Sequence, residues 1–356
     1  MRQITIAKEE AGQRLDKMLS RYFHTAPKSF LYKMLRKKNI TLNGKKATGA
    51  EKLTAGDEVK LFLAEETILA FQNGTAPSSV ENGSPAQTAP APKQPEKKLP
   101  PLDVLYEDPD VLFLAKPAGV LSQKAVPSDY SINEQLLDWL LDTGRMNVEQ
   151  MRLVKPSVCN RLDRNTSGLI AAGKTMNGLQ QLSAMIRDRK VRKFYYALVE
   201  GRMTGTEHLK GYWSKDEATN QVVITNIARP GAALVETAWE PIATSRRATL
   251  LQIELITGKT HQIRAHLASI GHPILGDSKY GEHAAHPETR TFHVRRQMLH
   301  AARMEFPTDS TLPALSGKHI TAPVPADFQK VIRRIKETDG WQPGIPEDFG
   351  ARPWKN

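Results

Sequence analysis

The hydrophobic positions of residues 1–65 change from helical to strand-like spacing along the chain. Near the start, large apolar side chains recur at intervals of three and four: Leu15, Met18, Leu19, Tyr22 and Phe23. This spacing predicts an amphipathic helix, and a second helix is expected after Ser29, a favourable N-cap residue. Asn43-Gly44 then predicts a tight hairpin, because this pair tolerates the left-handed backbone of such turns.

Residues 66–101 break this pattern. They hold 7 of the chain's 23 prolines and few large apolar side chains. Such a segment buries too little apolar surface to offset its ordering entropy, and proline keeps it extended. We therefore predict a linker at 66–101 between a small unit at 1–65 and a large unit at 102–335. A surface tail is expected at 336–356.

The large unit mixes strand-like and helical segments. Apolar or alternating runs predict strands at 111–115, 169–172, 191–199 and 250–256. Helices are predicted at 133–141, 176–187 and 261–270. Because strands and helices do not alternate regularly, the pattern favours an α+β fold with a mixed or antiparallel sheet over a doubly wound fold.

The charge of the chain indicates what kind of partner it binds. The 356 residues carry 50 Lys and Arg against 38 Asp and Glu, a net charge of +12. Residues 1–65 alone hold 14 basic and 7 acidic residues, so more than half of the excess lies there. Concentrated positive charge favours a polyanionic partner, and nucleic acid is the commonest one.

Other compositional features narrow the class of protein. The single cysteine, Cys159, excludes an intrachain disulfide and fits a reducing cytosol. No signal-peptide-like segment opens the sequence, and no run approaches the ~18 apolar residues of a membrane span. We expect a cytoplasmic protein without a membrane partner, and a monomer as the simplest state.

Nucleotide and metal chemistry find little support. Gly258-Lys259-Thr260 imitates the end of a phosphate-binding loop, but the required earlier glycine is replaced by Ile253. Seven histidines lie between positions 261 and 300, yet none has the spacing of a zinc motif. We therefore expect no metal and no cofactor, and we interpret most of these histidines as surface or core residues.

The segment from Asn160 to Ile170 carries the main candidate for catalysis. Asp163 lies between Arg161 and Arg164 on an expected loop before a strand, where a rigid scaffold presents side chains to ligands. Nearby cations favour the ionised carboxylate that a nucleophile or base needs. A structural Asp–Arg pair would give the same residues, so the segment alone leaves both interpretations open.

Two further segments contribute groups of the right kind. In the strand at 193–201, alternation places Tyr195 and Tyr196 on opposite faces, so one can line a cleft while the other fills the core. In the segment 256–267 a strand ends and a helix begins. Arg264 lies beside the apolar stripe of that helix, from where it can reach a carboxylate in a neighbouring cleft.

Together these segments resemble the RluA-type pseudouridine synthase family. The resemblance extends from about residue 104 to 307 and rests on six ordered motifs: Leu114-Ala-Lys-Pro-Ala-Gly-Val, Arg161-Leu-Asp-Arg-Asn-Thr-Ser-Gly-Leu, Lys193-Phe-Tyr-Tyr-Ala-Leu-Val-Glu-Gly, Thr257-Gly-Lys-Thr-His-Gln-Ile-Arg-Ala-His-Leu, Gly276-Asp-Ser-Lys-Tyr-Gly and Leu299-His-Ala-Ala-Arg-Met. It implies an enzyme that isomerises uridine in RNA to pseudouridine without metal, cofactor or redox change.

The resemblance also implies roles for individual residues. Asp163 matches the catalytic aspartate, Tyr195 the tyrosine that packs on the target base, and Arg264 the arginine that pairs with the aspartate. Arg161 and Arg164 are expected to touch RNA or to support the loop.

Residues 12–65 resemble the αL RNA-binding motif of a small-subunit ribosomal protein. In that motif the basic second helix and the turn after it lie against RNA phosphates. The resemblance makes four residues candidate phosphate contacts: Lys33, Arg36, Lys37 and Lys38. A solvated basic helix face is the alternative.

Two positions depart from the commonest family pattern, since Asn160 stands where histidine is usual and Lys259 replaces a frequent arginine. We expect the enzyme to remain active with both residues and to contact RNA differently. A non-catalytic RNA-binding protein, such as a ribosome-assembly factor, is the alternative function. The complete set of Asp163, Tyr195 and Arg264 argues against it. The N-terminal unit favours large-subunit ribosomal RNA over transfer RNA as the substrate.

Overall fold

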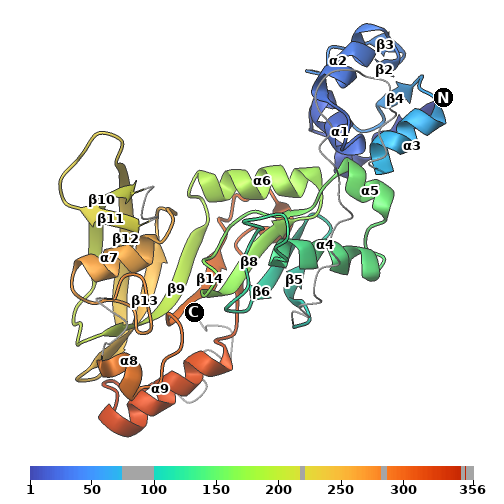
Figure 1. Ribbon diagram of the computed structural model, residues 1–356. Coiled ribbons are helices and arrows are strands. Elements are labelled where there is room, and N and C mark those ends of the chain that lie inside the picture. Colours follow the sequence, from blue (N-terminus) through green and yellow to red (C-terminus); the bar gives the residue numbers. More distant parts are fainter. Residues whose placement is uncertain (74–99, 217–220, 282–286, 346–348, 350–356) are drawn as a thin grey trace.

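The computed structural model describes residues 1–73, 100–216, 221–281, 287–345 and 349. Two sheets organise the described residues, a four-stranded sheet near the N-terminus and an eleven-stranded sheet in the rest of the chain. Figure 1 shows the N-terminal part beyond one end of the large sheet, beside α5 (Val148–Leu153).

The N-terminal part packs helices against a small sheet of order β1-β4-β2-β3. Its elements are β1 (Arg2–Thr5), a short 3-10 helix (Lys8–Glu10), α1 (Leu15–Tyr22), α2 (Lys28–Arg36), β2 (Ile40–Leu42), β3 (Lys45–Lys46), β4 (Glu58–Leu61) and α3 (Glu65–Asn73). The predicted first helix and the hairpin at Asn43-Gly44 are confirmed, and both turn residues have positive φ. The second helix begins one residue before the predicted cap, since Pro27 occupies the N-cap instead of Ser29.

The predicted boundary at residue 65 is wrong, because α3 extends the N-terminal part to Asn73. Ile68 and Phe71 of this helix are buried in the N-terminal core, and the Phe71 ring lies 4.7 Å from that of Phe30. These apolar side chains repay the ordering of the first part of the expected linker. The rest of that linker, 74–99, lies outside the described residues.

The N-terminal part is joined to the large part by specific contacts. Leu153 of α5 is buried within the N-terminal core, and its carbonyl accepts a hydrogen bond of 3.3 Å from Gln13 Nε2. Gln180 of α6 (Met176–Arg187) donates a hydrogen bond of 3.0 Å to the Gly12 carbonyl. The N-terminal part is therefore held at the edge of the large part that carries α5 and α6.

The large sheet has the strand order β11-β10-β12-β13-β9-β14-β8-β6-β5, with β15 beside β14 and β7 beside β8. The strands are β5 (Asp103–Glu107), β6 (Val111–Lys116), β7 (Ser157–Val158), β8 (Ser167–Gly173), β9 (Arg192–Glu200), β10 (Glu207–Asp216), β11 (Gln221–Thr225), β12 (Ala233–Thr244), β13 (Ala248–Leu255), β14 (Leu299–Glu305) and β15 (His319–Thr321). The other helices are α4 (Ile132–Asp142), α7 (Gln262–Ser269), α8 (Pro287–Thr291), α9 (Ala326–Asp339) and a 3-10 turn (Pro313–Leu315). This mixed sheet with attached helices confirms the α+β prediction.

The four predicted strands correspond to β6, β8, β9 and β13, and the three predicted helices to α4, α6 and α7. Among the described strand pairs of the large sheet, only β8 and β14 run parallel. Gly168 lets these strands approach closely, because a Cβ atom there would lie 2.1 Å from the Ala301 carbonyl oxygen. Strand β8 of this parallel pair begins directly after the loop that carries Asp163.

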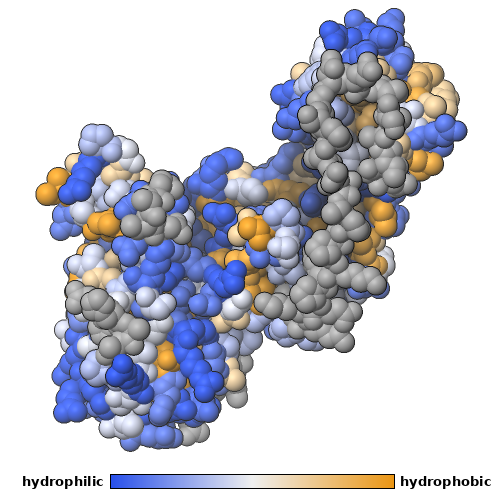
Figure 2. All heavy atoms as spheres, in the orientation of Figure 1, coloured by the Kyte–Doolittle hydropathy of each residue, from blue (hydrophilic) through white to orange (hydrophobic). Residues whose placement is uncertain are grey.

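The expected surface tail at 336–356 is wrong in its first part. Helix α9 continues to Asp339, and Trp341 is buried with its indole N–H bonded to the Ile332 carbonyl at 3.1 Å. Ile345 is buried too, so apolar side chains attach this segment to the main core. Figure 2 shows hydrophilic side chains over much of the face above α7 to α9. Within the described residues, no helix has the length and apolar character needed to cross a membrane.

Candidate active site

A cleft beside the central strands brings the three predicted catalytic residues together. Asp163 comes from the loop between β7 and β8, Tyr195 from β9 and Arg264 from α7. Twelve residues line the cleft: Arg161, Leu162, Asp163, Thr166, Tyr195, Leu255, Lys259, His261, Gln262, Ile263, Arg264 and Leu299. Segments about a hundred residues apart in sequence thus meet at one site.

The loop that carries Asp163 is fixed from below by the loop after β6. Ser122 Oγ donates to the Leu162 carbonyl at 2.8 Å and accepts from the Leu162 N–H at 2.9 Å. Ser122 itself is buried. Because both backbone groups next to Asp163 are satisfied by one hydroxyl, the aspartate backbone is held in place before any ligand arrives.

Lys116, at the end of β6, supports the other side of the same loop. Its buried ammonium group donates to the carbonyl groups of Pro117, Val120 and Arg164 at 2.9, 2.8 and 3.0 Å. Arg296 adds a hydrogen bond of 3.2 Å to the Asn165 carbonyl. A loop with this many anchors presents its carboxylate with little freedom.

Arg264 links Asp163 to a second, fully buried carboxylate. Its Nη1 lies 2.8 Å from Asp163 Oδ2, while Nε and Nη2 bind Asp277 at 2.7 and 2.8 Å. Burial alone would lower the pKa of Arg264, but the hydrogen bonds and charges of Asp277 and Asp163 raise that pKa above its usual value. The arginine is therefore permanently charged, and it holds one oxygen of Asp163.

Tyr195 faces the cleft, as the alternation along β9 predicts. Its side chain is 6% exposed, whereas Tyr196 points to the opposite face and packs against Phe349 at 4.9 Å between ring centroids. Burial, with the negative charge of Asp163, raises the pKa of Tyr195 above its usual range. Tyr195 is consequently a neutral phenol at physiological pH, suited to stacking and to hydrogen bonding.

Sequence reasoning missed two residues, one bound to Arg264 and one beside Asp163. Asp277, in a motif already singled out, anchors Arg264. His261, which was interpreted as a surface or core histidine, lines the cleft with Nε2 3.9 Å from Asp163 Oδ1. Its Nδ1 lies 2.8 Å from the hydroxyl of Tyr280. The signal in the sequence was the place of His261 three residues before Arg264.

The predicted RNA contacts near the cleft differ in position. Arg161 lines the cleft and is exposed, and the exposed Arg164 lies beside it on the same loop. Lys259 is exposed at the cleft rim, with Nζ 5.8 Å from the centroid of the Trp213 ring. Asn160 instead bonds the backbone of β8, accepting from Ala171 N at 2.8 Å. Its amide supports the strand.

The four basic residues predicted to contact phosphates lie in the N-terminal part and not in the cleft. All are exposed, along the last turn of α2 and just after it: Lys33, Arg36, Lys37 and Lys38. Lys38 has a φ of 58°, a left-handed conformation that turns the chain into β2. The cluster therefore forms one exposed positive surface.

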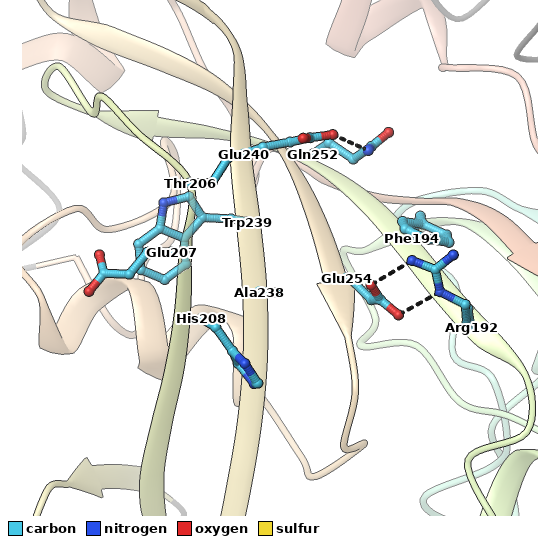
Figure 3. A pocket seen from close by; sticks show the side chains of 10 residues that line it. All are labelled: Arg192, Phe194, Thr206, Glu207, His208, Ala238, Trp239, Glu240, Gln252 and Glu254. Carbon is cyan, nitrogen blue, oxygen red and sulfur yellow. Dashed lines mark hydrogen bonds and ion pairs between the residues drawn. The ribbon is translucent and has the colours of Figure 1, made fainter. Parts of the chain in front are cut away.

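A larger cavity, of about 470 Å³, lies on the opposite face of the sheet (Figure 3). Arg192 and Phe194 of β9 line it, and they alternate with Tyr195. Three glutamates face this cavity: Glu207, Glu240 and Glu254. Arg192 pairs with Glu254 at 2.9 Å, so its charge is already neutralised. An excess of carboxylates repels phosphate, which leaves the smaller cleft as the candidate active site.

The cleft has the parts of an acid–base or nucleophilic site. Arg264 holds one oxygen of Asp163, and the carboxylate is 25% exposed toward the cleft. The neutral ring of Tyr195 forms one wall, and Arg161 stands at the entrance. Such a site fits a flat, partly charged ligand attached to an anionic chain.

Comparison with known proteins agrees with this chemistry. A family model described as RNA pseudouridylate synthase matches residues 110–269. The ribosomal large subunit pseudouridine synthase C of Vibrio cholerae is 30% identical over 335 residues, which cover 94% of this chain and 96% of that protein. The protein of the same name in Escherichia coli is 26% identical over 352 residues, covering 94% and 96% of the two chains.

Proposed function

The chain belongs to the RluA-type family of RNA pseudouridine synthases, and we propose that it isomerises uridines in large-subunit ribosomal RNA with Asp163 as the nucleophile. The observation that carries the proposal is the ion pair of 2.8 Å between Asp163 and Arg264, at a cleft that Tyr195 also lines. The two relatives named above, both large-subunit enzymes, support the choice of RNA.

The reaction breaks the bond between the sugar and the uracil, turns the base, and rejoins it through a ring carbon. A uridine must leave its stack to enter the cleft, which costs a few kcal/mol. Stacking of the base on Tyr195 and contacts of Arg161 and Arg164 with the RNA backbone would offset this cost. Arg264 donates to Asp163 Oδ2 at 2.8 Å and so holds the carboxylate in position until it attacks.

The N-terminal part supplies affinity away from the chemistry. Its exposed basic cluster would neutralise phosphates of the same RNA and so bring the cleft to its target. Contacts of α5 and α6 with the N-terminal part fix the distance between the two binding regions. We place the enzyme in the cytoplasm, since its relatives act on ribosomal RNA.

Asp163→Asn tests the catalytic assignment. The variant keeps the shape of the side chain but loses the charge, so we expect RNA binding within about twofold of wild type and no detectable turnover. Melting temperature is measured alongside, because removing one partner of a partly buried pair also destabilises the fold. Wild-type turnover in Asp163→Asn would reject Asp163 as the nucleophile.

Pseudouridine mapping of total RNA tests the substrate. Cells without the gene should lack one or a few pseudouridines in large-subunit ribosomal RNA, and wild type but not Asp163→Asn should restore them. Loss of sites confined to transfer RNA would contradict the proposed substrate while leaving the reaction intact.

A further inference from the structure

We propose that His261 is a positioning residue for the reaction, which Tyr280 fixes in the tautomer that presents Nε2–H to the free oxygen of Asp163. The inference rests on the proposed role of Asp163 as the nucleophile. Arg264 already occupies Oδ2 of that carboxylate, and His261 Nε2 is 3.9 Å from Oδ1. The two basic groups thus approach the carboxylate from different sides.

The hydrogen bonds of Tyr280 decide which ring nitrogen carries the proton. The N–H of Val222 on β11 donates to the Tyr280 hydroxyl at 3.1 Å, so the oxygen already acts as an acceptor there. The hydroxyl proton then points to His261 Nδ1, which lies 2.8 Å away. Nδ1 must accept this bond, and the proton of neutral His261 consequently sits on Nε2.

The opposite tautomer is unfavourable for two reasons. With the proton on Nδ1, the Tyr280 oxygen would accept from both neighbours, and the described residues offer no acceptor for its own proton. The lone pair of Nε2 would also face the negative charge of Asp163. Burial lowers the pKa of His261; Arg264 and Lys279 lower it further, while Asp163 and Asp277 oppose them. The neutral ring therefore predominates at pH 7.

The backbone conformation of His261 determines the direction in which its ring points. His261 has a φ of 55°, a left-handed conformation, and it precedes α7 as the N-cap without a side-chain capping bond. Residues other than glycine adopt this conformation at some cost, and such strain concentrates at functional sites. A separation of 3.9 Å is longer than a hydrogen bond, and we expect it to shorten when RNA fills the cleft, as catalytic contacts often do.

The donor has a specific use in the reaction. When Asp163 attacks the sugar through one oxygen, a new C–O bond forms, the bond from the sugar to uracil breaks, and the negative charge leaves with the uracil. The second oxygen becomes a carbonyl oxygen, which still accepts a hydrogen bond. With a donor on each side, both oxygens of Asp163 are hydrogen-bonded throughout the reaction, and the plane of the carboxylate is fixed. Because Val222 belongs to β11, the contact through Tyr280 also connects the β10–β11 hairpin to the orientation of the catalytic group.

Two substitutions at the same position separate this role from a merely structural one. His261→Gln places an amide N–H near the former Nε2, whereas His261→Asn retains only an acceptor near Nδ1. Asparagine tolerates left-handed backbone better than glutamine does, so a backbone role predicts that Asn is the better replacement. The positioning role predicts the reverse order for the rate of conversion.

The experiment is single-turnover conversion of a ribosomal RNA fragment, with RNA affinity and melting temperature measured for each variant. We expect His261→Asn to lower the rate about tenfold at unchanged affinity, His261→Gln to retain most of it, and Tyr280→Phe to fall between. Tyr130→Phe is the matched control, since its hydroxyl bonds Asp138 at the surface. Equal rates for Asn and wild type, or a better rate for Asn than for Gln, would overturn the inference. Wild-type conversion with inactive Asp163→Asn shows independently that the proposed function stands.

Discussion

Asp277 holds the guanidinium group of Arg264 through two hydrogen bonds of 2.7 and 2.8 Å, and only Nη1 remains for Asp163. The carboxylate of Asp277 is completely buried, and it also accepts from the backbone N–H groups of Lys279 and Tyr280. The direction in which Arg264 points is therefore set by a residue that does not face the substrate.

Asp277→Asn should disturb catalysis without touching the cleft. An amide can accept only one of the two hydrogen bonds from Arg264, so the guanidinium turns and the contact with Asp163 is weakened. We expect the rate of conversion to fall at least about tenfold. Removing one partner of a buried pair should also lower the free energy of unfolding by about 3–5 kcal/mol. Single-turnover kinetics and denaturant unfolding measure the two effects.

Asp188→Asn is the matched control, because Asp188 pairs with Arg187 at an exposed site. It should leave both rate and stability unchanged. Full activity of Asp277→Asn, with Arg264 still at Asp163, would show that the arginine needs no second carboxylate.

Ser122→Ala should loosen the loop that carries Asp163. Alanine leaves the Leu162 N–H and carbonyl without their partner at a buried position, which costs about 1–3 kcal/mol for each group. We expect a lower melting temperature and a reduced rate, with RNA affinity nearly unchanged. Ser20→Ala, which removes a hydroxyl bonded to a helix carbonyl in the N-terminal part, serves as the control. Identical kinetics in the two variants would argue against loop support by Ser122.

Single alanine substitutions of Lys33, Arg36, Lys37 and Lys38 should weaken RNA binding without slowing the chemical step. Each lost phosphate contact reduces the slope of log K against log salt by about one. Affinity is measured over a range of salt concentrations, and conversion is followed at saturating enzyme. A substitution that slows saturated conversion but leaves the salt slope unchanged would contradict the assigned role.

Acid should destabilise the protein through two buried histidines. Burial lowers the pKa of both His266 and His300 to about 4, below the value of about 6.5 in an unfolded chain. The unfolded chain thus binds more protons between these values, so stability is complete above pH 6.5 and decreases as the pH falls toward 4. The loss approaches about 3 kcal/mol for each histidine.

Urea unfolding between pH 7.5 and 4.5 tests this dependence. His266→Asn keeps an acceptor or donor near Thr237 but no longer titrates, so its pH dependence should be flatter than that of wild type. The exposed His24 provides the control for loss of an imidazole, and His24→Asn should leave the free energy of unfolding at pH 7.5 unchanged. Parallel curves for wild type and His266→Asn would assign the acid sensitivity to other groups.

The pattern of apolar and polar residues predicts the structure correctly where a single local feature determines it. The alternation along β9 placed Tyr195 on the cleft side, and the periodicity near Leu15 located α1. The edges of the linker and the tail were mispredicted because average composition concealed a few apolar side chains. Ile68 and Phe71 in one segment, and Trp341 and Ile345 in the other, are buried in hydrophobic cores and attach segments that are otherwise polar or turn-rich.

The rest of the site depends on tertiary contacts that spacing does not reveal. The predicted helix at 261–270 includes His261, which implies that its side chain points in a direction typical of a helix. Its left-handed backbone instead turns the ring toward Asp163. The partnership of Asp277 with Arg264 depends on the loop that follows α7. Strand β10 has a burial pattern that switches mostly between exposed and intermediate positions, so its apolar alternation is weak.

Asp163 and Arg264 are separated by 101 positions in the chain, so the active site can form only after both have been synthesised. A ribosome releases the N-terminal part long before Arg264 and Asp277 are made, and this part supplies every buried side chain of its hydrophobic core except Leu153. If the basic cluster of the N-terminal part contacts RNA as proposed, the growing chain acquires its affinity for RNA before its ability to alter RNA. An interrupted chain would be a competitor for the same sites and not a slower enzyme, because it would occupy the RNA without modifying it.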